Sequence, residues 1–183
     1  MVSLETPVCD FGKKAPDFNL LGVDGENWNF EKCGGDKGTL VMFICNHCPY
    51  VKSVIDRIVR DTSELQKIGV NAVAIMSNNP DEYAEDSFEN MQKISRNLDF
   101  SFPYLIDSTQ SIAREYGAVC TPDFFGYNSR GELQYRGRLD ESRKQAAPAD
   151  VRRDLFLAMQ QVAQTGHGPK QQIPSMGCSI KWY

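Results

Sequence analysis

The sequence predicts an α/β domain with a mixed central sheet flanked by helices. Two short apolar runs rich in strand-forming residues, "TLVMFI" (39–44) and "VNAVAIMS" (70–77), are separated by a segment with helical periodicity. Strands that are apolar on both faces are typical of the centre of a sheet covered on each side by helices. Further along, two strand-like segments surround a turn at 128–131, which adds an antiparallel pair to the sheet.

The first half of the chain is expected to begin with a β-hairpin. Residues 16–30 alternate in polarity around Asp24-Gly25, a dipeptide that favours tight hairpin turns. After the 39–44 strand, apolar residues recur with helical spacing and predict one helix that ends at Gly69. The residues that carry this spacing are Val51, Val54, Ile55, Ile58 and Val59.

The second half of the chain continues the alternation of helix and strand. A helix is predicted from an Asn79 cap to about Asn97, then a short strand at 104–107 and a helix capped by Ser108. A last helix is expected over 149–164. The residues after it are rich in Gly and Pro and have no helical period, so we expect a domain over 1–165 and an extended tail, 166–183, packed on or near it.

Composition narrows the class of protein. The chain has 183 residues, of which 41 % are hydrophobic, so it can bury a core. The net charge is −4 and no Lys/Arg cluster is present, which argues against a nucleic-acid partner. No apolar run is long enough to span a bilayer, and the first residues do not read as a secretory signal. We therefore expect a cytoplasmic protein with no membrane partner; the oligomeric state stays open.

The chemistry is expected at the motif Cys45-Asn46-His47-Cys48, where the 39–44 strand passes into the next helix. Free N–H groups at a helix N-terminus stabilise a thiolate and lower the pKa of a cysteine there. Two such thiols can attack a disulfide and then resolve the mixed disulfide internally. Because the turn exposes the first sulfur and shields the second, Cys45 is the predicted nucleophile and Cys48 the resolving cysteine.

Two other interpretations of this motif stay open. A charged His47 is expected to favour the Cys45 thiolate, although an exposed histidine without a role is the simpler interpretation. A metal site needs a second ligand pair, and the sequence has no second CxxC and only one other histidine, His167. We therefore predict no metal. The alternative is a non-catalytic peptide- or metal-binding module, with metal ligands drawn from Cys45, Cys48, Cys120 and Cys178.

Thr121 and Pro122 are the predicted substrate dock. Pro122 opens a strand after a loop that contains a glycine, and a proline in such a place can be cis. A cis bond would turn the backbone of Thr121 towards Cys45 and offer its N–H and C=O to an extended substrate. An ordinary trans proline at a sheet edge is the alternative.

Several segments together resemble a known family. "APDFNL", "CNHCP", "YGAVCTPDFFGYNSRGEL" and "YRGRLDES" resemble the thioredoxin-fold redoxins, most closely the peroxiredoxin-like, thioredoxin-family proteins with a CxxC (AhpC/TSA-like). The tail "PSMGCSIKW" fits the same group. The resemblance covers residues 10–183. It implies a thioredoxin fold with Cys45 as nucleophile, Cys48 as resolving cysteine and Pro122 as a cis-proline facing them.

The departures from these families bear on the reaction. Relative to peroxiredoxins aligned on Cys48, Val41, Cys45 and Pro122 stand where a proline, a threonine and a peroxide-activating arginine would be. This disfavours the alternative of a thiol peroxidase with Cys48 as the peroxidatic residue. Relative to thioredoxins, Thr39 stands where a buried aspartate would be, so the proton of Cys48 must be handled by another group or by water.

The sequence thus predicts a thiol-disulfide oxidoreductase that needs no bound cofactor, because its electrons come from another dithiol. Its expected partner is a protein or small-molecule disulfide or dithiol. Cys120, two residues before Pro122, and Cys178, in the tail, are the further redox candidates.

Overall fold

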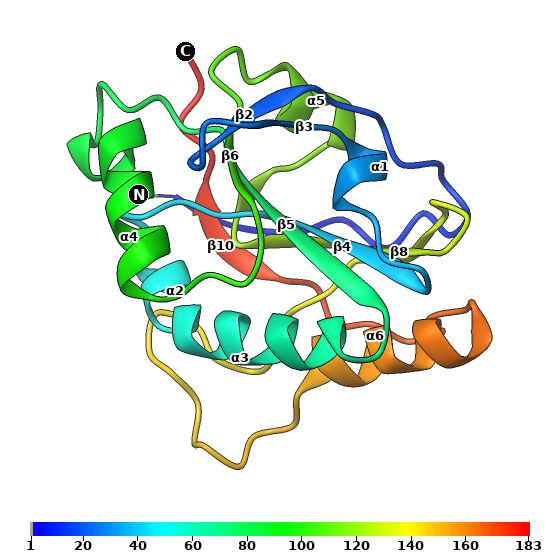
Figure 1. Cartoon of the computed structure of the whole chain (residues 1–183). Helices are drawn as coiled ribbons and strands as arrows, with labels where there is room; N and C mark the ends of the chain where they lie inside the picture. Colours follow the sequence, from blue (N-terminus) through cyan, green and yellow to red (C-terminus); the bar gives the residue numbers. More distant parts are fainter. Residues whose placement is uncertain (1) are drawn as a thin grey trace.

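The main sheet of the molecule has seven strands with helices on both faces (Figure 1). The computed structural model of the chain describes residues 2–183. The strand order is β3-β2-β6-β5-β4-β8-β9, with β4, β5 and β6 parallel and the other neighbours antiparallel. The bounds are β2 Leu20–Gly22, β3 Asn27–Trp28, β4 Gly38–Phe43, β5 Val70–Met76, β6 Tyr104–Ile106, β8 Asp123–Asn128 and β9 Leu133–Tyr135. The predicted α/β class with a mixed central sheet is confirmed.

Strand β4 carries the core to both faces of this sheet, because all of its residues are buried. Leu40 and Met42 pack on one side, and Val41 and Phe43 pack on the other. The first side is covered by α2 (Pro49–Lys52), α3 (Ile55–Gln66), α4 (Phe88–Asn97) and α6 (Asp154–Thr165). The second is covered by α1 (Phe30–Cys33) and α5 (Ser111–Tyr116). Figure 1 shows α3 and α6 side by side below the sheet.

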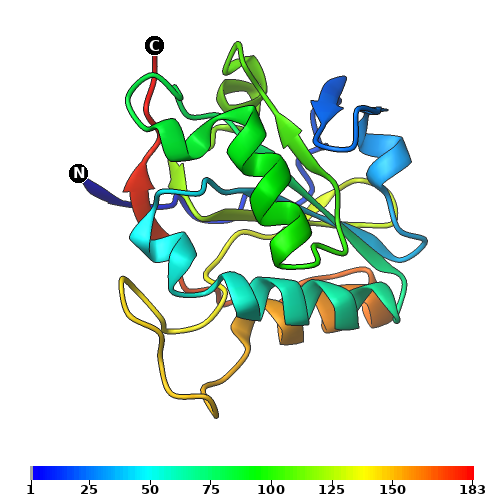
Figure 2. The ribbon, with the colours of Figure 1, turned by 60° about the vertical axis from the view of Figure 1, so that its left-hand side comes forward.

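A second sheet of three strands joins the two ends of the chain. Its order is β1 (Ser3–Glu5), β10 (Met176–Ser179) and β7 (Cys120–Thr121), all antiparallel. Figure 2 shows β10 in red beside the dark blue N-terminal segment. Residues 166–183 therefore return over the domain, and β10 lies directly against the strand that precedes Pro122.

The predicted hairpin and central strands are confirmed. β2 and β3 pair around Gly25, whose φ of 86° suits a tight turn that glycine adopts without strain. The predicted single helix over residues 51–69 is wrong, since α2 and α3 are separate. Val54, between the two helices, has a non-helical φ of −127°. The Ser53 hydroxyl beside it donates to the carbonyls of Tyr50 and Arg143.

The predicted helix start at Asn79 is wrong. Asn79 caps only a turn, through a hydrogen bond from the Asp81 N–H, and α4 begins at Phe88 after a Ser87 cap. Between them lies a short 3-10 turn, η1 (Ala84–Asp86). The side chain of Asp86 in this turn reaches back to the loop after β4, so long-range contacts fix the segment outside the helix.

Two other helix starts also lie later than predicted. Ser108 does not cap α5; the carboxylate of Asp107 accepts the Ala113 N–H instead, and α5 begins at Ser111. The last helix begins at Asp154 rather than 149. Arg153, the residue before it, binds the carboxylates of Asp61 and Glu64 on α3. No helix in residues 2–183 is long and apolar enough to cross a membrane.

A candidate redox site at the end of β4

The two cysteines of the CxxC motif lie where β4 passes into α2. Cys45 follows the strand by two residues, and Cys48 is the N-cap of α2, with Pro49 at the first helical position. Both side chains are enclosed, with 1 % of Cys45 and none of Cys48 exposed. The expectation that the first sulfur is exposed is therefore wrong, whereas the second is shielded as expected.

The sulfur of Cys45 faces a threonine and a histidine. Its Sγ lies 3.3 Å from Oγ1 of Thr121 and 3.6 Å from Nδ1 of His47. A small apolar cavity also adjoins it, lined by residues of the loop, α2, α3 and α4, among them Ile44, Val51, Ile55, Ile94 and Phe100. Cys45 is thus the motif cysteine that adjoins empty space.

Asp86 is the hub of the loop that carries the motif. Its carboxylate is fully buried and accepts the backbone N–H groups of Asn46 at 2.8 Å and His47 at 3.1 Å. It also accepts from the Asn78 amide at 3.3 Å. These hydrogen bonds satisfy the charge and fix the turn between the two cysteines.

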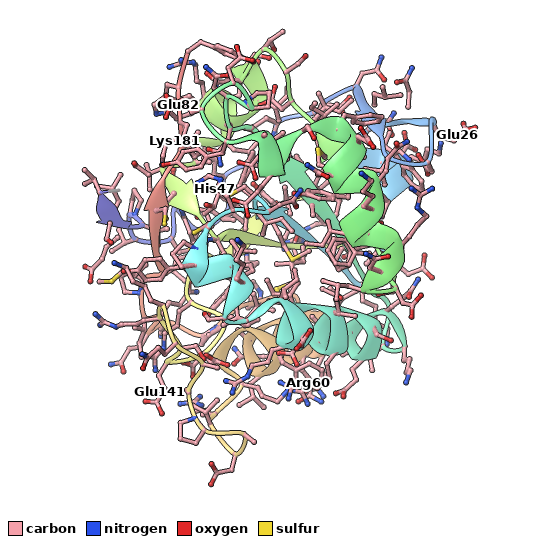
Figure 3. The ribbon with its side chains drawn as sticks, turned by 90° about the vertical axis from the view of Figure 1, so that its left-hand side faces the viewer. Glu26, His47, Arg60, Glu82, Glu141 and Lys181 are labelled. Carbon is pink, nitrogen blue, oxygen red and sulfur yellow. The ribbon has the colours of Figure 1, made fainter. Side chains whose placement is uncertain are left out.

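His47 is held by this carboxylate rather than by the cysteine. Its Nδ1 lies 2.6 Å from Oδ2 of Asp86, a short charge-assisted contact in which Nδ1 donates. The ring stacks on Tyr83 with centroids 3.8 Å apart, and Nε2 is buried without a partner among residues 2–183. Figure 3, which faces this end of the molecule, labels His47 at the site with Lys181 above it.

The sulfur of Cys48 lies on the other side of the pair, against β7 and β10. As a thiol it donates to the carbonyl of Thr121 at 3.1 Å. Thr121 brings it near the other two sulfurs, because Oγ1 of Thr121 lies 3.3 Å from the Cys45 sulfur and Cys178 lies opposite Thr121 on β10. Three cysteine sulfurs are therefore neighbours in space, with Cys48 between Cys45 and Cys178.

The two motif cysteines differ in the direction of their pKa shifts. Hydrogen bonding from the Cys45 thiol, helped by donors on Cys178 and Thr121, lowers the pKa of Cys48 to about 5. Burial raises the pKa of Cys45 well above its usual range, and the hydrogen bond to Cys48 and the Asp86 charge add to this. The directions of the two shifts favour the thiolate on Cys48, whereas the sequence predicted a Cys45 thiolate tuned by His47.

The remaining candidates have separate environments. The Thr121-Pro122 bond is cis, and Thr121 contacts both motif sulfurs. Cys120 is buried beside them, but its thiol points to the carbonyl of Pro122, and burial raises its pKa above the usual range. It does not join the line of three sulfurs.

One set of side chains has the composition of a metal site. The ligand atoms of Cys45, His47 and Asp86 lie within 4.8 Å of one another and are buried. However, Nδ1 and Oδ2 are 2.6 Å apart, a distance that places a proton between them, and the nearby Cys48 sulfur faces Thr121 and Cys178. The four-cysteine metal set considered from the sequence is not assembled, because Cys120 turns away.

Sequence reasoning missed Asp86 and Tyr83 as parts of the site. Both fall in the segment predicted to be helical, where an acidic residue and an aromatic ring are unremarkable. Their role depends on contacts with residues about 40 positions away, for which the local pattern gives no signal. Asp86 is thus a buried carboxylate on the Cys45 side of the pair, supplied by another part of the chain than Thr39.

Comparisons with known proteins agree with this architecture. A conserved protein from Geobacillus kaustophilus is 42 % identical, with a TM-score of 0.94 over 100 % of this chain and 97 % of that one. A hypothetical protein from Sinorhizobium meliloti 1021 is 33 % identical, with a TM-score of 0.91 over 98 % and 97 %. A thiol:disulfide interchange protein from Chlorobium tepidum TLS is 18 % identical, with a TM-score of 0.64 over 83 % and 97 %. No curated protein sequence matches the chain.

The fold and the site define a thioredoxin-like redoxin: a mixed sheet between helices, with a cysteine pair where a central strand meets a helix. Residues 11–136 match the model of the AhpC/TSA family. The chain belongs to that family.

Proposed function

We propose that the protein is a thiol-disulfide oxidoreductase whose redox couple is Cys45–Cys48. The observation that carries the proposal is the contact of the two buried thiols with each other and with Thr121, in a fold shared with a protein named for thiol:disulfide interchange. The substrate is a protein or small-molecule disulfide, and no nucleic acid, membrane or bound cofactor takes part.

In the proposed reaction Cys45 attacks the substrate. The cavity beside Cys45 gives the incoming sulfur a place, whereas Cys48 is enclosed by β7 and β10. The hydrogen bond between the thiols lets the proton of Cys45 pass to Cys48, which leaves the thiolate on Cys45. Attack then forms a mixed disulfide and expels one substrate thiolate, which takes up the proton that Cys48 holds. The Cys48 thiolate attacks Sγ of Cys45, forms the Cys45–Cys48 disulfide and expels the second substrate thiolate.

The substrate is expected to approach at Pro122, since the backbone edge of Thr121 is paired with β10. A surface hollow adjoins Pro122 and is lined by Tyr50, Phe124, Arg138 and Met176. The lining mixes apolar side chains with charges of both signs, Arg138 and Arg143 beside Glu5, Asp140 and Glu141, which suits a flexible peptide or a small disulfide that carries polar groups.

Insulin reduction tests the proposal. Cys45→Ser is expected to reduce insulin no faster than the reductant alone, because no nucleophile remains at the cavity. Cys48→Ser is expected to accumulate a mixed disulfide with its substrate through Cys45. The matched control is Cys33→Ala, which removes a buried thiol from the opposite core and should keep full activity. Full insulin reduction by Cys45→Ser would sink the proposal.

A second candidate function, a thiol peroxidase at Cys48, is favoured by the pKa of about 5 at this cysteine. Stopped-flow consumption of hydrogen peroxide separates the two functions. Rapid sulfenate formation at Cys48, retained in Cys45→Ser, would put the peroxidase first. The oxidoreductase proposal expects slow peroxide consumption and rapid exchange with disulfides.

A further inference from the structure

Strand β10 occupies the backbone edge at which a substrate was expected to dock. Its register places Cys178 opposite Thr121 and Ser179 opposite Cys120 in an antiparallel ladder. The N–H and C=O groups of this edge are therefore paired by the chain's own tail. An extended substrate strand at Thr121 would have to replace β10.

The approach of β10 to the site is unusually close and depends on a glycine. A Cβ atom on Gly177 would lie 2.1 Å from the Thr121 carbonyl oxygen and 3.0 Å from the Pro122 nitrogen. These are backbone atoms that cannot turn aside, so only glycine lets the strand come this near. The strand also has its other edge covered by β1, through Leu4 opposite Gly177.

This placement brings a third sulfur to the dithiol. Cys178 is 2 % exposed and lies opposite Thr121, whose carbonyl accepts from the Cys48 thiol at 3.1 Å, so Cys178 and Cys48 are neighbours. Burial and the neighbouring Cys48 raise the pKa of Cys178 to about 12, so it is a protonated thiol when the tail is docked. Cys48 consequently has a cysteine on either side, one on the motif and one on a substrate-like strand.

We propose that Cys178 is a third redox cysteine. After the dithiol has been oxidised, Cys178 replaces Cys45 as the disulfide partner of Cys48. This inference rests on the proposed function, because the Cys45–Cys48 disulfide is its starting point. The Cys178 thiol loses its proton and attacks Sγ of Cys48; the Cys48–Cys178 bond forms as the Cys45–Cys48 bond breaks. Cys45 leaves as a thiolate and takes up a proton. One disulfide is exchanged for another, so no further oxidant is needed.

The exchange has a structural consequence. It covalently attaches β10 to α2 and returns a free thiol at Cys45, next to the cavity. The oxidised protein is thereby divided between a form with the tail held only by hydrogen bonds and a form with the tail locked across the dock. The close ladder at Thr121 favours the second form by holding the attacking sulfur in place.

Disulfide mapping of the full chain tests this. Reduced protein is treated with one equivalent of diamide, free thiols are blocked with iodoacetamide, and the digest is analysed by mass spectrometry without reduction. A Cys45–Cys48 link should appear first, followed by a Cys48–Cys178 link in which Cys45 is alkylated. In Cys45→Ser, the same treatment should give Cys48–Cys178 directly.

Two matched variants sharpen the test. Cys178→Ala should keep the Cys45–Cys48 link and lose the delayed alkylation of Cys45, whereas Cys33→Ala should behave as the wild type. Gly177→Val should weaken β10 docking and lower the yield of the Cys48–Cys178 link; its folding is checked by circular dichroism. A Cys45–Cys48 link that persists with Cys178 always alkylated would overturn this inference and leave the proposed function standing. Absence of the Cys45–Cys48 link would overturn both.

Discussion

Nδ1 of His47 lies 2.6 Å from Oδ2 of Asp86, and both side chains are buried. This pair lies on the Cys45 side of the dithiol, since Nδ1 of His47 is also 3.6 Å from the Cys45 sulfur. Burial is the main cause of the raised pKa of Cys45, and the Asp86 carboxylate adds to it by opposing a second negative charge there. A residue on η1, outside the motif, therefore contributes to the difference between the two cysteines.

Replacing Asp86 should change both the thiol chemistry and the stability. Asp86→Asn removes the charge that raises the pKa of Cys45, so alkylation of Cys45 should begin at lower pH than in the wild type. The variant also weakens several buried hydrogen bonds, at a cost of about 1–3 kcal/mol in urea unfolding. Glu85→Gln is the control, because its exposed partner Lys52 contributes little. An unchanged Cys45 alkylation profile would contradict this account.

The pKa of Cys48 gives a second prediction, on the reduced protein. The native thiol ionises near pH 5, whereas the same thiol in the unfolded chain ionises near 9. Between these values the native state binds fewer protons than the unfolded state, so the free energy of unfolding rises with pH. The gain is lost as the pH falls through 5. Thiolate absorbance near 240 nm should report the ionisation, and Cys48→Ser should lack both the absorbance step and the stability gain.

A buried ion pair away from the sulfurs gives a third prediction. The guanidinium of Arg136 binds Asp123 on β8 at 3.0 Å and lies over the ring of Phe125. Burial raises the pKa of Asp123 to about 6, although Arg136 partly offsets this. Arg136→Met leaves the carboxylate without its partner, which should cost about 3–5 kcal/mol at pH 8.

The pH dependence of that variant has a defined sign. A carboxyl group whose native pKa is raised binds an extra proton on folding, so its destabilising effect is smaller at low pH and grows as the pH rises. Arg136→Met should therefore lose less stability at pH 5 than at pH 8 in urea titrations. Lys14→Met, which breaks an exposed pair with Glu132 and an exposed hydrogen bond to the Arg130 carbonyl, is the control. Equal losses at the two pH values would show that the charge of Asp123 is not the cause.

Local sequence patterns were sufficient for the fold class and for the position of the cysteine pair. The apolar runs of β4 and β5 are continuous because helices cover both faces, and Asp24-Gly25 fixes a turn through its own backbone preference. These features depend on neighbours in the chain. For the same reason the transition from β4 to α2 at Cys45 and Cys48 could be predicted.

The parts that could not be predicted depend on distant contacts. Asp86 is drawn out of a helix by N–H groups 39 and 40 residues away, and Arg153 delays α6 by binding α3. Strand β10 has no apolar alternation, because Gly177 and Cys178 are selected by the closeness of β7 rather than by a sheet face. Such elements have no signature within a window of sequence.

Strand β4 joins the two halves of the core and ends two residues before Cys45. A substitution that opens a cavity on either face of the sheet should displace β4. Because the strand ends beside Cys45, the displacement should also move the Cys45 sulfur. The reaction rate of Cys45 with an alkylating agent is therefore a gauge of packing throughout the interior. A mild packing defect far from the site should therefore change the alkylation rate of Cys45 before the protein as a whole unfolds.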